Sequence, residues 1–129
     1  MIQTQLVSII ISAFNAEKFI ALTLDSVLQQ SYLNVEIIVV NDGSTDNTLE
    51  ILKKYENRIR IINKSNSGES DTISIGFKEA SGDLLLVVSA DDPLFTERLF
   101  TNIFQQFNQN ENLMAIYPDW QMIDAGGNV

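Results

Sequence analysis

Short apolar runs alternate along the chain with segments whose apolar residues recur every three or four positions. The runs are typical of strands buried on both faces, and the wider spacing is typical of helices that pack one face on a sheet. We predict strands at Leu6–Ser12, Val35–Val40, Arg58–Ile62, Asp83–Val88 and, as a shorter candidate, Leu113–Tyr117. The alternation predicts βαβ units, and therefore an α/β fold: a three-layer α/β/α sandwich around a mostly parallel sheet.

The first two predicted helices each follow one of the first two strands. The first spans about Ala16 to Gln30, where apolar residues keep helical spacing. In the second, Ser44 or Thr45 is expected to cap the start, and Asp46 lies in the first turn, where the helix dipole favours an anion. Both helices are therefore expected to place an apolar face on the sheet.

The last two predicted helices are bounded by glycine and proline. The third turns Ile73, Phe77 and Ala80 inward and ends at Gly82, which we expect to be its C′ glycine. The fourth opens at Pro93. Its broad apolar face is expected to lie in the core and consists of Phe95, Leu99, Phe100, Ile103, Phe104 and Phe107.

Length and composition predict one domain over residues 1–129, because 129 residues with 45% hydrophobic content suffice for one core. The net charge of -9, with scattered Lys and Arg, argues against nucleic acid as a partner. No apolar stretch approaches the ~20 residues of a membrane span, and Met1–Gln5 does not resemble a signal peptide. The end at Gly126–Val129 looks like an interrupted turn, which predicts a piece of a longer protein.

The chain contains neither cysteine nor histidine. Disulfides, thiolate metal sites and most histidine-based catalytic or zinc sites are thereby excluded. The lack of cysteine also fits a reducing compartment. Any metal bound by this chain should therefore be a hard cation held by oxygen ligands.

Acidic residues directly follow two of the predicted strands. Asp42 comes after the second strand, and Asp91 and Asp92 come after the fourth. Phe14 follows the first strand in the same way. The carboxyl ends of parallel strands share one edge of a sheet, and that edge is where ligands bind in open α/β folds. We therefore expect the three carboxylates to gather there around a metal and a polar ligand.

Each of these residues also has a purely structural explanation when it is taken alone. Asp92 followed by Pro93 could cap the last helix. Asp42 lies in an Asn-Asp-Gly-Ser turn and could bond nearby backbone amides. Phe14 could be a side chain that fills the hydrophobic core (a core plug), and Gly68 could be a loop glycine. These explanations do not account for the coincidence of such residues at three strand ends.

Several segments resemble family 2 glycosyltransferases of the GT-A fold, and the resemblance covers essentially the whole chain. The matching segments are, in order, Val7–Glu17, Thr23–Tyr32, Glu36–Thr48, Asn66–Gly68, Ser81–Asp83 and Ser89–Asp92. The resemblance implies a nucleotide-diphosphate-sugar transferase of GT-A type that uses Mn²⁺ or Mg²⁺. It also implies a glycan or lipid-linked acceptor, as in cell-surface polysaccharide synthesis, and a cytoplasmic location, at the membrane face in the full-length protein.

The resemblance also implies roles for individual residues. Phe14 and the backbone near Ser12 would line the base, commonly uracil, and Asp42 would accept its imide N–H. Asp91 would approach the ribose, and Asp92 would hold the metal that bridges the two phosphates. A cation at this place stabilises the charge that a diphosphate gains as it leaves.

Three departures from the family pattern qualify these expectations. Ser89 stands where many relatives have a first acid, which predicts weak binding of bare metal. Ile73-Ser74 replaces a common Arg-Asn, so a basic contact near the nucleotide is missing. The catalytic base of the family usually lies well beyond the position of Val129, and no spacing assigns that role to Asp119 or Asp124.

Two classes of protein remain as alternatives. A receiver domain also gathers acids around Mg²⁺, but it needs them after the first strand, where this chain has Ser12–Asn15. A non-catalytic nucleotide-binding or scaffold domain with a degenerate site is the more serious alternative. Neither a GxGxxG turn nor a GxxxxGK[ST] loop is present, so no motif in the sequence supports a dinucleotide dehydrogenase or a P-loop hydrolase.

Overall fold

A computed structural model of the chain describes residues 5–94 and 96–116. In chain order its elements are β1 (Val7–Ala13), α1 (Ile20–Leu28), β2 (Val35–Asp42), α2 (Thr48–Lys53), β3 (Arg60–Lys64), α3 (Glu69–Glu79), β4 (Leu84–Ser89) and α4 (Leu99–Gln109). The four strands form one sheet in the order β3-β2-β1-β4, and every neighbouring pair is parallel. The predicted α/β fold is therefore confirmed.

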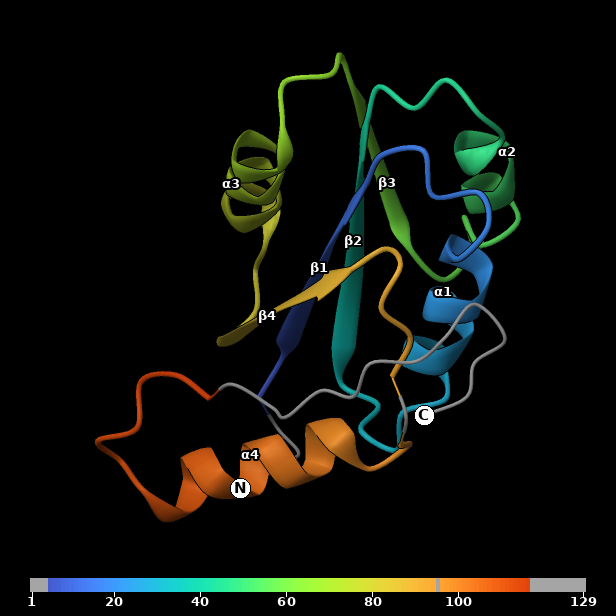
Figure 1. Cartoon of the computed structure of the whole chain (residues 1–129). Coiled ribbons are helices and arrows are strands. Elements are labelled where there is room, and N and C mark those ends of the chain that lie inside the picture. The colour runs from blue at the N-terminus through green and yellow to red at the C-terminus, as the bar shows by residue number, and fades with distance from the viewer. Residues whose placement is uncertain (1–4, 95, 117–129) are drawn as a thin grey trace.

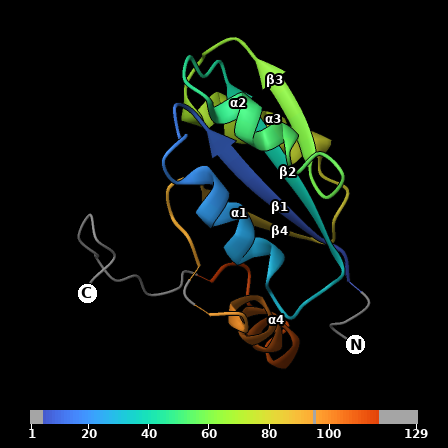
Figure 2. The ribbon, with the colours of Figure 1, turned by 90° about the vertical axis from the view of Figure 1, so that its right-hand side faces the viewer.

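The helices form a layer on each face of the sheet. α1 and α2 lie on one face and α3 lies on the other, as both ribbon views show (Figures 1 and 2). α4 lies across the end of the sheet opposite the carboxyl ends of the strands (Figure 1). The ligand-binding edge predicted for this fold is consequently free of α4.

The main core lies between the sheet and the α1 layer. Alternate residues of β1 point into it, because side chains along a strand alternate between faces. α4 adds its apolar face, and Phe104 meets Tyr32 edge to face with ring centroids 4.6 Å apart. The largest fully buried side chains of this core are Phe100, Ile9, Ile11, Ile20, Leu24 and Leu52.

α3 approaches the opposite face through a glycine. A Cβ added at Gly76 would collide with the side chain of Ile10 in the middle of β1, so only glycine permits this close packing. The buried residues of α3 are Thr72 and Gly76, whereas Phe77 is 43% exposed. The prediction that Phe77 points inward is therefore wrong, because the helix rests on its smallest residues.

β4 is covered on one face only among the described residues. Val88 is buried in the main core, but Leu85 and Val87 on the opposite face are 52% and 43% exposed. α3 packs over β1 and β2 and leaves this edge strand uncovered. The prediction of strands buried on both faces thus holds for β1 and is wrong for β4.

Several predicted boundaries are also wrong. The last helix begins at Leu99 and not at Pro93, so Asp92 does not cap it. Gly82 is not a C′ glycine: a Cβ there would lie 2.5 Å from the Ser8 Oγ atom, so this glycine permits close packing on β1. Residues 113–116 have no regular structure, and Tyr117 lies outside the described residues, as do Phe95, Asp119 and Asp124.

Candidate functional site

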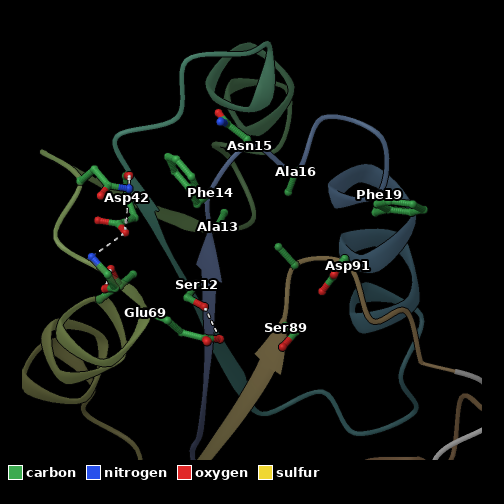
Figure 3. Close-up of a pocket in the computed structure, with 14 residues that line it drawn as sticks. Ser12, Ala13, Phe14, Asn15, Ala16, Phe19, Asp42, Glu69, Ser89 and Asp91 are labelled. Carbon is green, nitrogen blue, oxygen red and sulfur yellow. Dashed lines mark hydrogen bonds between the residues drawn. The ribbon is translucent and has the colours of Figure 1, made fainter.

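A pocket of about 530 Å³ lies at the carboxyl ends of β1, β2 and β4, and α3 and α1 flank it (Figure 3). It is lined by Ser12, Ala13, Phe14, Asn15, Ala16, Phe19, Asp42, Asn66, Gly68, Glu69, Thr72, Ser89, Ala90 and Asp91. Four of the five predicted site residues are thus brought together. Among these lining residues three are acidic and none is basic, so an anionic ligand needs a cation or backbone donors to bind here.

Asp42 ends β2 and is almost completely enclosed, with 4% of its surface exposed. Its Oδ1 atom accepts hydrogen bonds from the Lys64 Nζ atom at 2.5 Å and from the Ser67 backbone N–H at 2.9 Å. Its Oδ2 atom accepts the Gly68 N–H at 3.1 Å and the Asn66 amide at 3.4 Å. Asp42 thus does bond backbone amides, but they belong to the loop after β3 and not to its own Asn-Asp-Gly-Ser turn.

The surroundings of Asp42 keep it ionised. Burial alone raises the pKa of this carboxyl. The hydrogen bond from Lys64, the N–H groups of Ser67 and Gly68 and the positive charge of Lys64 outweigh burial, so the pKa lies below its ordinary value of 3.8. An ionised carboxylate only accepts hydrogen bonds, so the group that Asp42 binds in the pocket must be a donor.

The loops that follow β1 and β2 are tied to each other by side chains. Asp46 accepts the Glu17 backbone N–H at 3.1 Å, and Glu17 in return accepts the Asn47 N–H at 3.0 Å. Asn15, whose φ of 47° is unusual for a residue other than glycine, accepts the Thr45 N–H at 2.8 Å. These reciprocal bonds hold the chain just after Phe14 in a defined position.

Asp46 lies just before α2, whose N-cap residue is Asn47. Its Oδ1 atom accepts the backbone N–H of Thr48, the first residue of the helix, at 2.9 Å. The predicted caps Ser44 and Thr45 instead contact Asn15. Burial raises the pKa of Asp46, but the hydrogen bonds from Thr48 and from the Glu17 amide outweigh burial and lower it.

Phe14 and Ser12 line the pocket from β1 and the turn after it. Phe14 is 52% exposed, so the alternative of a core plug is wrong. Its ring stands at the pocket rim in Figure 3, where a flat ligand could stack on it. Ser12 is half-buried, and its hydroxyl lies 3.5 Å from the Glu69 carboxylate across the pocket floor.

The end of β4 differs from the end of β2. Asp91 is exposed and lines the pocket on the side of α1, away from Asp42 (Figure 3). Asp92 is also exposed and is not among the lining residues, although its backbone N–H donates to the Ser89 carbonyl at 3.1 Å and so closes a turn. Within the described part of the chain, neither carboxylate is held as Asp42 is.

The predicted gathering of three carboxylates is not found. Within residues 5–94 and 96–116, no three acidic side chains come close enough to hold a metal ion by themselves. Asp91 and Asp92 nevertheless offer two adjacent carboxylates in the open. Their hard oxygen donors fit a site in which Mg²⁺ takes one or two protein carboxylates and completes its shell with ligand phosphates and water.

Sequence reasoning missed two charged residues of this region, Glu69 and Lys64. Glu69 begins α3 and lines the pocket, but the sequence prediction gave this residue no role. Lys64 ends β3 and pairs in register with Asp42, whereas the third strand was predicted to end at Ile62. Expecting parallel neighbours to end together would have placed a lysine beside Asp42.

Solved structures of glycosyltransferases share the fold of this chain. Staphylococcus aureus TarS 1–349, solved in complex with UDP-GlcNAc, matches with a TM-score of 0.76 and 29% identity over 81% of this chain and 32% of that chain. The mannosyltransferase PcManGT from Pyrobaculum calidifontis, solved with GDP-Man and Mn²⁺, shares the fold with a TM-score of 0.74 at 19% identity over 78% and 32% of the two chains. The fold is that of GT-A glycosyltransferases.

The family follows from the sequence match. Residues 8–119 match Glycosyl transferase family 2, and the chain belongs to that family. An uncharacterized glycosyltransferase of Haemophilus influenzae is 40% identical over 118 residues, which are 86% of this chain and 35% of that protein. The chain spans less than half the length of the curated relatives it matches, with 42%, 18% and 35% in three cases.

Proposed function

We propose that this chain is the donor-binding part of a glycosyltransferase that takes its sugar from a nucleotide diphosphate, with UDP-sugar as the favoured donor. The observation that carries the proposal is the pocket at the carboxyl edge, which brings Ser12, Phe14, Asp42 and Asp91 around one space. The similarity to a TarS structure that holds UDP-GlcNAc supports the choice of UDP.

In this proposal the base lies between Phe14 and Asp42. Stacking on an aromatic ring is worth about 1–3 kcal/mol per base in single-stranded nucleic-acid complexes, and an exposed Phe14 offers such a ring. The base imide N–H donates to Asp42, which is ionised and can only accept. The backbone near Ser12 lines the base, and Asp91, on the opposite side of the pocket, accepts from the ribose hydroxyls.

The diphosphate lies toward the end of β4 in this arrangement. Asp92 would hold Mn²⁺ or Mg²⁺ together with oxygens of the two phosphates. A cation there offsets the negative charge that the diphosphate gains as the bond to the sugar breaks. Because the lining residues carry no basic side chain, we propose that nucleotide binding depends strongly on the metal.

The remaining steps need groups outside this pocket. We propose an inverting transfer, in which the acceptor oxygen attacks the anomeric carbon from the face opposite the leaving diphosphate. The base that removes the acceptor proton, and the site for a glycan or lipid-linked acceptor, would lie after residue 129, as the short span relative to the relatives suggests. Residues 1–129 then form a single domain within a longer enzyme that works at the cytoplasmic face of a membrane.

No helix in the described part of the chain is long and apolar enough to cross a membrane. Vesicle flotation of the full-length protein tests the location at the membrane face.

A non-catalytic nucleotide-binding domain is the second candidate. Ser89 in the place of an acid and Ile73-Ser74 in the place of Arg-Asn favour it, since both weaken a donor site. Hydrolysis of UDP-sugar by the full-length protein separates the two functions. Turnover supports the transferase, and binding without turnover supports the scaffold.

The donor site itself is tested by calorimetric titration of UDP with and without Mn²⁺. We expect binding that needs the metal, is lost in Asp92→Ala and is weakened in Asp42→Asn. Glu56→Ala, which removes an exposed acid outside the pocket, is the matched control and should bind as the parent does. Failure of UDP, GDP and TDP to bind under either condition would overturn the proposal.

A further inference from the structure

Lys64 lies behind the pocket and not in it. It is the last residue of β3, in register with Asp42 on the neighbouring strand, and its side chain is 13% exposed. The residues that line the pocket include Asp42 but not Lys64. Any effect of Lys64 on a bound nucleotide must therefore act through the groups it contacts, and of these Asp42 lines the pocket.

The three N–H donors of the Lys64 ammonium are all engaged. They reach the Asp42 Oδ1 atom at 2.5 Å, the Ser65 carbonyl at 2.8 Å and the Ser67 hydroxyl. A fourth polar group, the Asp71 carboxylate, lies 3.8 Å away. The ammonium is thus fixed in place and has no donor left for a ligand.

The hydrogen bonds of Asp42 leave one position for a ligand. Oδ1 is filled by Lys64 and the Ser67 N–H, and Oδ2 by the Gly68 N–H at 3.1 Å. The remaining bond, from the Asn66 amide to Oδ2, is the longest at 3.4 Å. Asn66 lines the pocket, so a base N–H would replace this weak contact first.

We infer that Lys64 is the positioning residue that sets base selectivity, because it holds Asp42 as a charged acceptor and turns one oxygen, Oδ2, toward the base. This inference rests on the proposed nucleotide site. A fixed acceptor at this place favours uracil, whose ring presents an imide N–H, over cytosine, whose corresponding nitrogen is itself an acceptor. Two facing acceptors repel each other, and a polar group left without a partner is costly in a closed site.

Removing the charge of Lys64 should make the preference for UDP over CDP depend on pH. Without the ammonium, the hydrogen bond and the charge of Lys64 no longer lower the pKa of Asp42, and only the Ser67 and Gly68 N–H groups oppose burial, so the pKa rises. Protonation then turns the carboxyl into a donor that suits cytosine. Glu69 of α3 lines the same pocket as Asp42, and the Asp71 carboxylate lies 3.8 Å from the Lys64 ammonium; neither carries a positive charge that could take the place of Lys64. The preference for UDP over CDP should then decline as the pH falls.

The test is the ratio of UDP to CDP affinity, measured by calorimetry with Mn²⁺ between about pH 5 and about pH 8. The two nucleotides share the same diphosphate, so its titration and its metal cancel in the ratio. Lys64→Gln removes the charge and keeps N–H donors, and Lys64→Arg keeps the charge. Lys53→Gln, at an exposed lysine paired with Glu50 on α2, is the matched control.

We expect the parent, Lys64→Arg and Lys53→Gln to prefer UDP by about tenfold or more at every pH, as a difference of about 1.4 kcal/mol requires. Lys64→Gln should approach that ratio at the alkaline end and lose most of it at the acidic end. If Lys64→Gln does not fold, Lys64→Met makes the same comparison with an apolar side chain of similar length.

Two other results would overturn the inference, and they differ in what they say about the site. A ratio in Lys64→Gln that equals the parent ratio at every pH, with binding still dependent on Asp92, removes the role of Lys64 and leaves the donor site intact. Absence of UDP binding by the parent removes both.

Discussion

The carboxyl ends of β2 and β4 both carry aspartates, but the two ends are built differently. Asp42 at the end of β2 is enclosed and accepts bonds from Lys64 and two backbone amides. Asp91 and Asp92 after β4 are exposed. The side of the pocket at Asp42, which we call the built end, is thus formed before any ligand arrives. The side at Asp91 and Asp92, which we call the open end, offers negative charge without a fixed geometry.

Strand order explains this difference. β2 lies inside the sheet between β1 and β3, so the loop after β3 folds over its end and supplies donors to Asp42. β4 is an edge strand of the described sheet and has a neighbour on one side only. Preorganisation therefore follows from position in the sheet, and the edge position leaves room for a metal and phosphates.

The largest expected effect is on stability at the built end. Asp42→Ala leaves the Lys64 charge and two backbone N–H groups buried without their partner. Breaking a buried ion pair in this way costs about 3–5 kcal/mol of unfolding free energy. Urea denaturation measures this loss, with Asp91→Ala as the matched change at the open end. Equal stability of the two variants would contradict the contrast between the ends.

Asp92→Ala should produce the reverse pattern. The exposed carboxylate contributes little to folding, so the urea midpoint should stay at the parent value. The gain in UDP affinity on adding Mn²⁺ should fall by about tenfold or more, which is about 1.4 kcal/mol. Calorimetry with and without Mn²⁺ measures this gain. A shifted midpoint with an unchanged metal effect would show that Asp92 is structural.

Acid should erase the contribution of the built end. An aspartate whose pKa is lowered on folding stabilises the protein above its ordinary pKa, and this contribution disappears as the pH falls through the folded-state value. The stability difference between the parent and Asp42→Asn should therefore be largest near neutral pH and shrink below 3.8. Glu36 and Asp46, whose pKa values are also lowered, affect both proteins alike. Urea curves at successive pH values measure the difference, which should not be constant.

The sequence predicts the central parts of the molecule well because local patterns determine them. Apolar runs identify β1, β2 and β4, and the carboxyl edge follows from parallel pairing. The prediction also brings Ser12, Phe14, Asp42 and Asp91 to one pocket. The position of Asp92 at the same edge is found too, in an exposed turn just outside that pocket.

What the sequence does not predict depends on contacts between distant segments. Leu85 and Val87 form part of an apolar run, and only the placement of α3 shows that the described residues leave one face of β4 uncovered. Lys64 was missed because the end of a strand depends on its partner: β3 extends to Lys64 to match β2. The start of α4 at Leu99 likewise reflects its packing at the end of α1, where Gln30 accepts the Phe100 N–H.

The smallest expected effect comes from adding an acid at the open end. Ser89 is half-buried at the end of β4, lines the pocket and stands where the family resemblance implies a first acid. Ser89→Asp should therefore strengthen binding of bare Mn²⁺ severalfold, about 1 kcal/mol, because a further hard oxygen ligand joins Asp91 and Asp92. Asn108→Asp adds the same charge on α4, at the opposite end of the sheet, and controls for general attraction. Calorimetric titration of Mn²⁺ without nucleotide measures both variants. Equal gains in Mn²⁺ affinity would mean that charge alone is responsible. A gain confined to Ser89→Asp would show that the open end needs one more ligand to form a metal site.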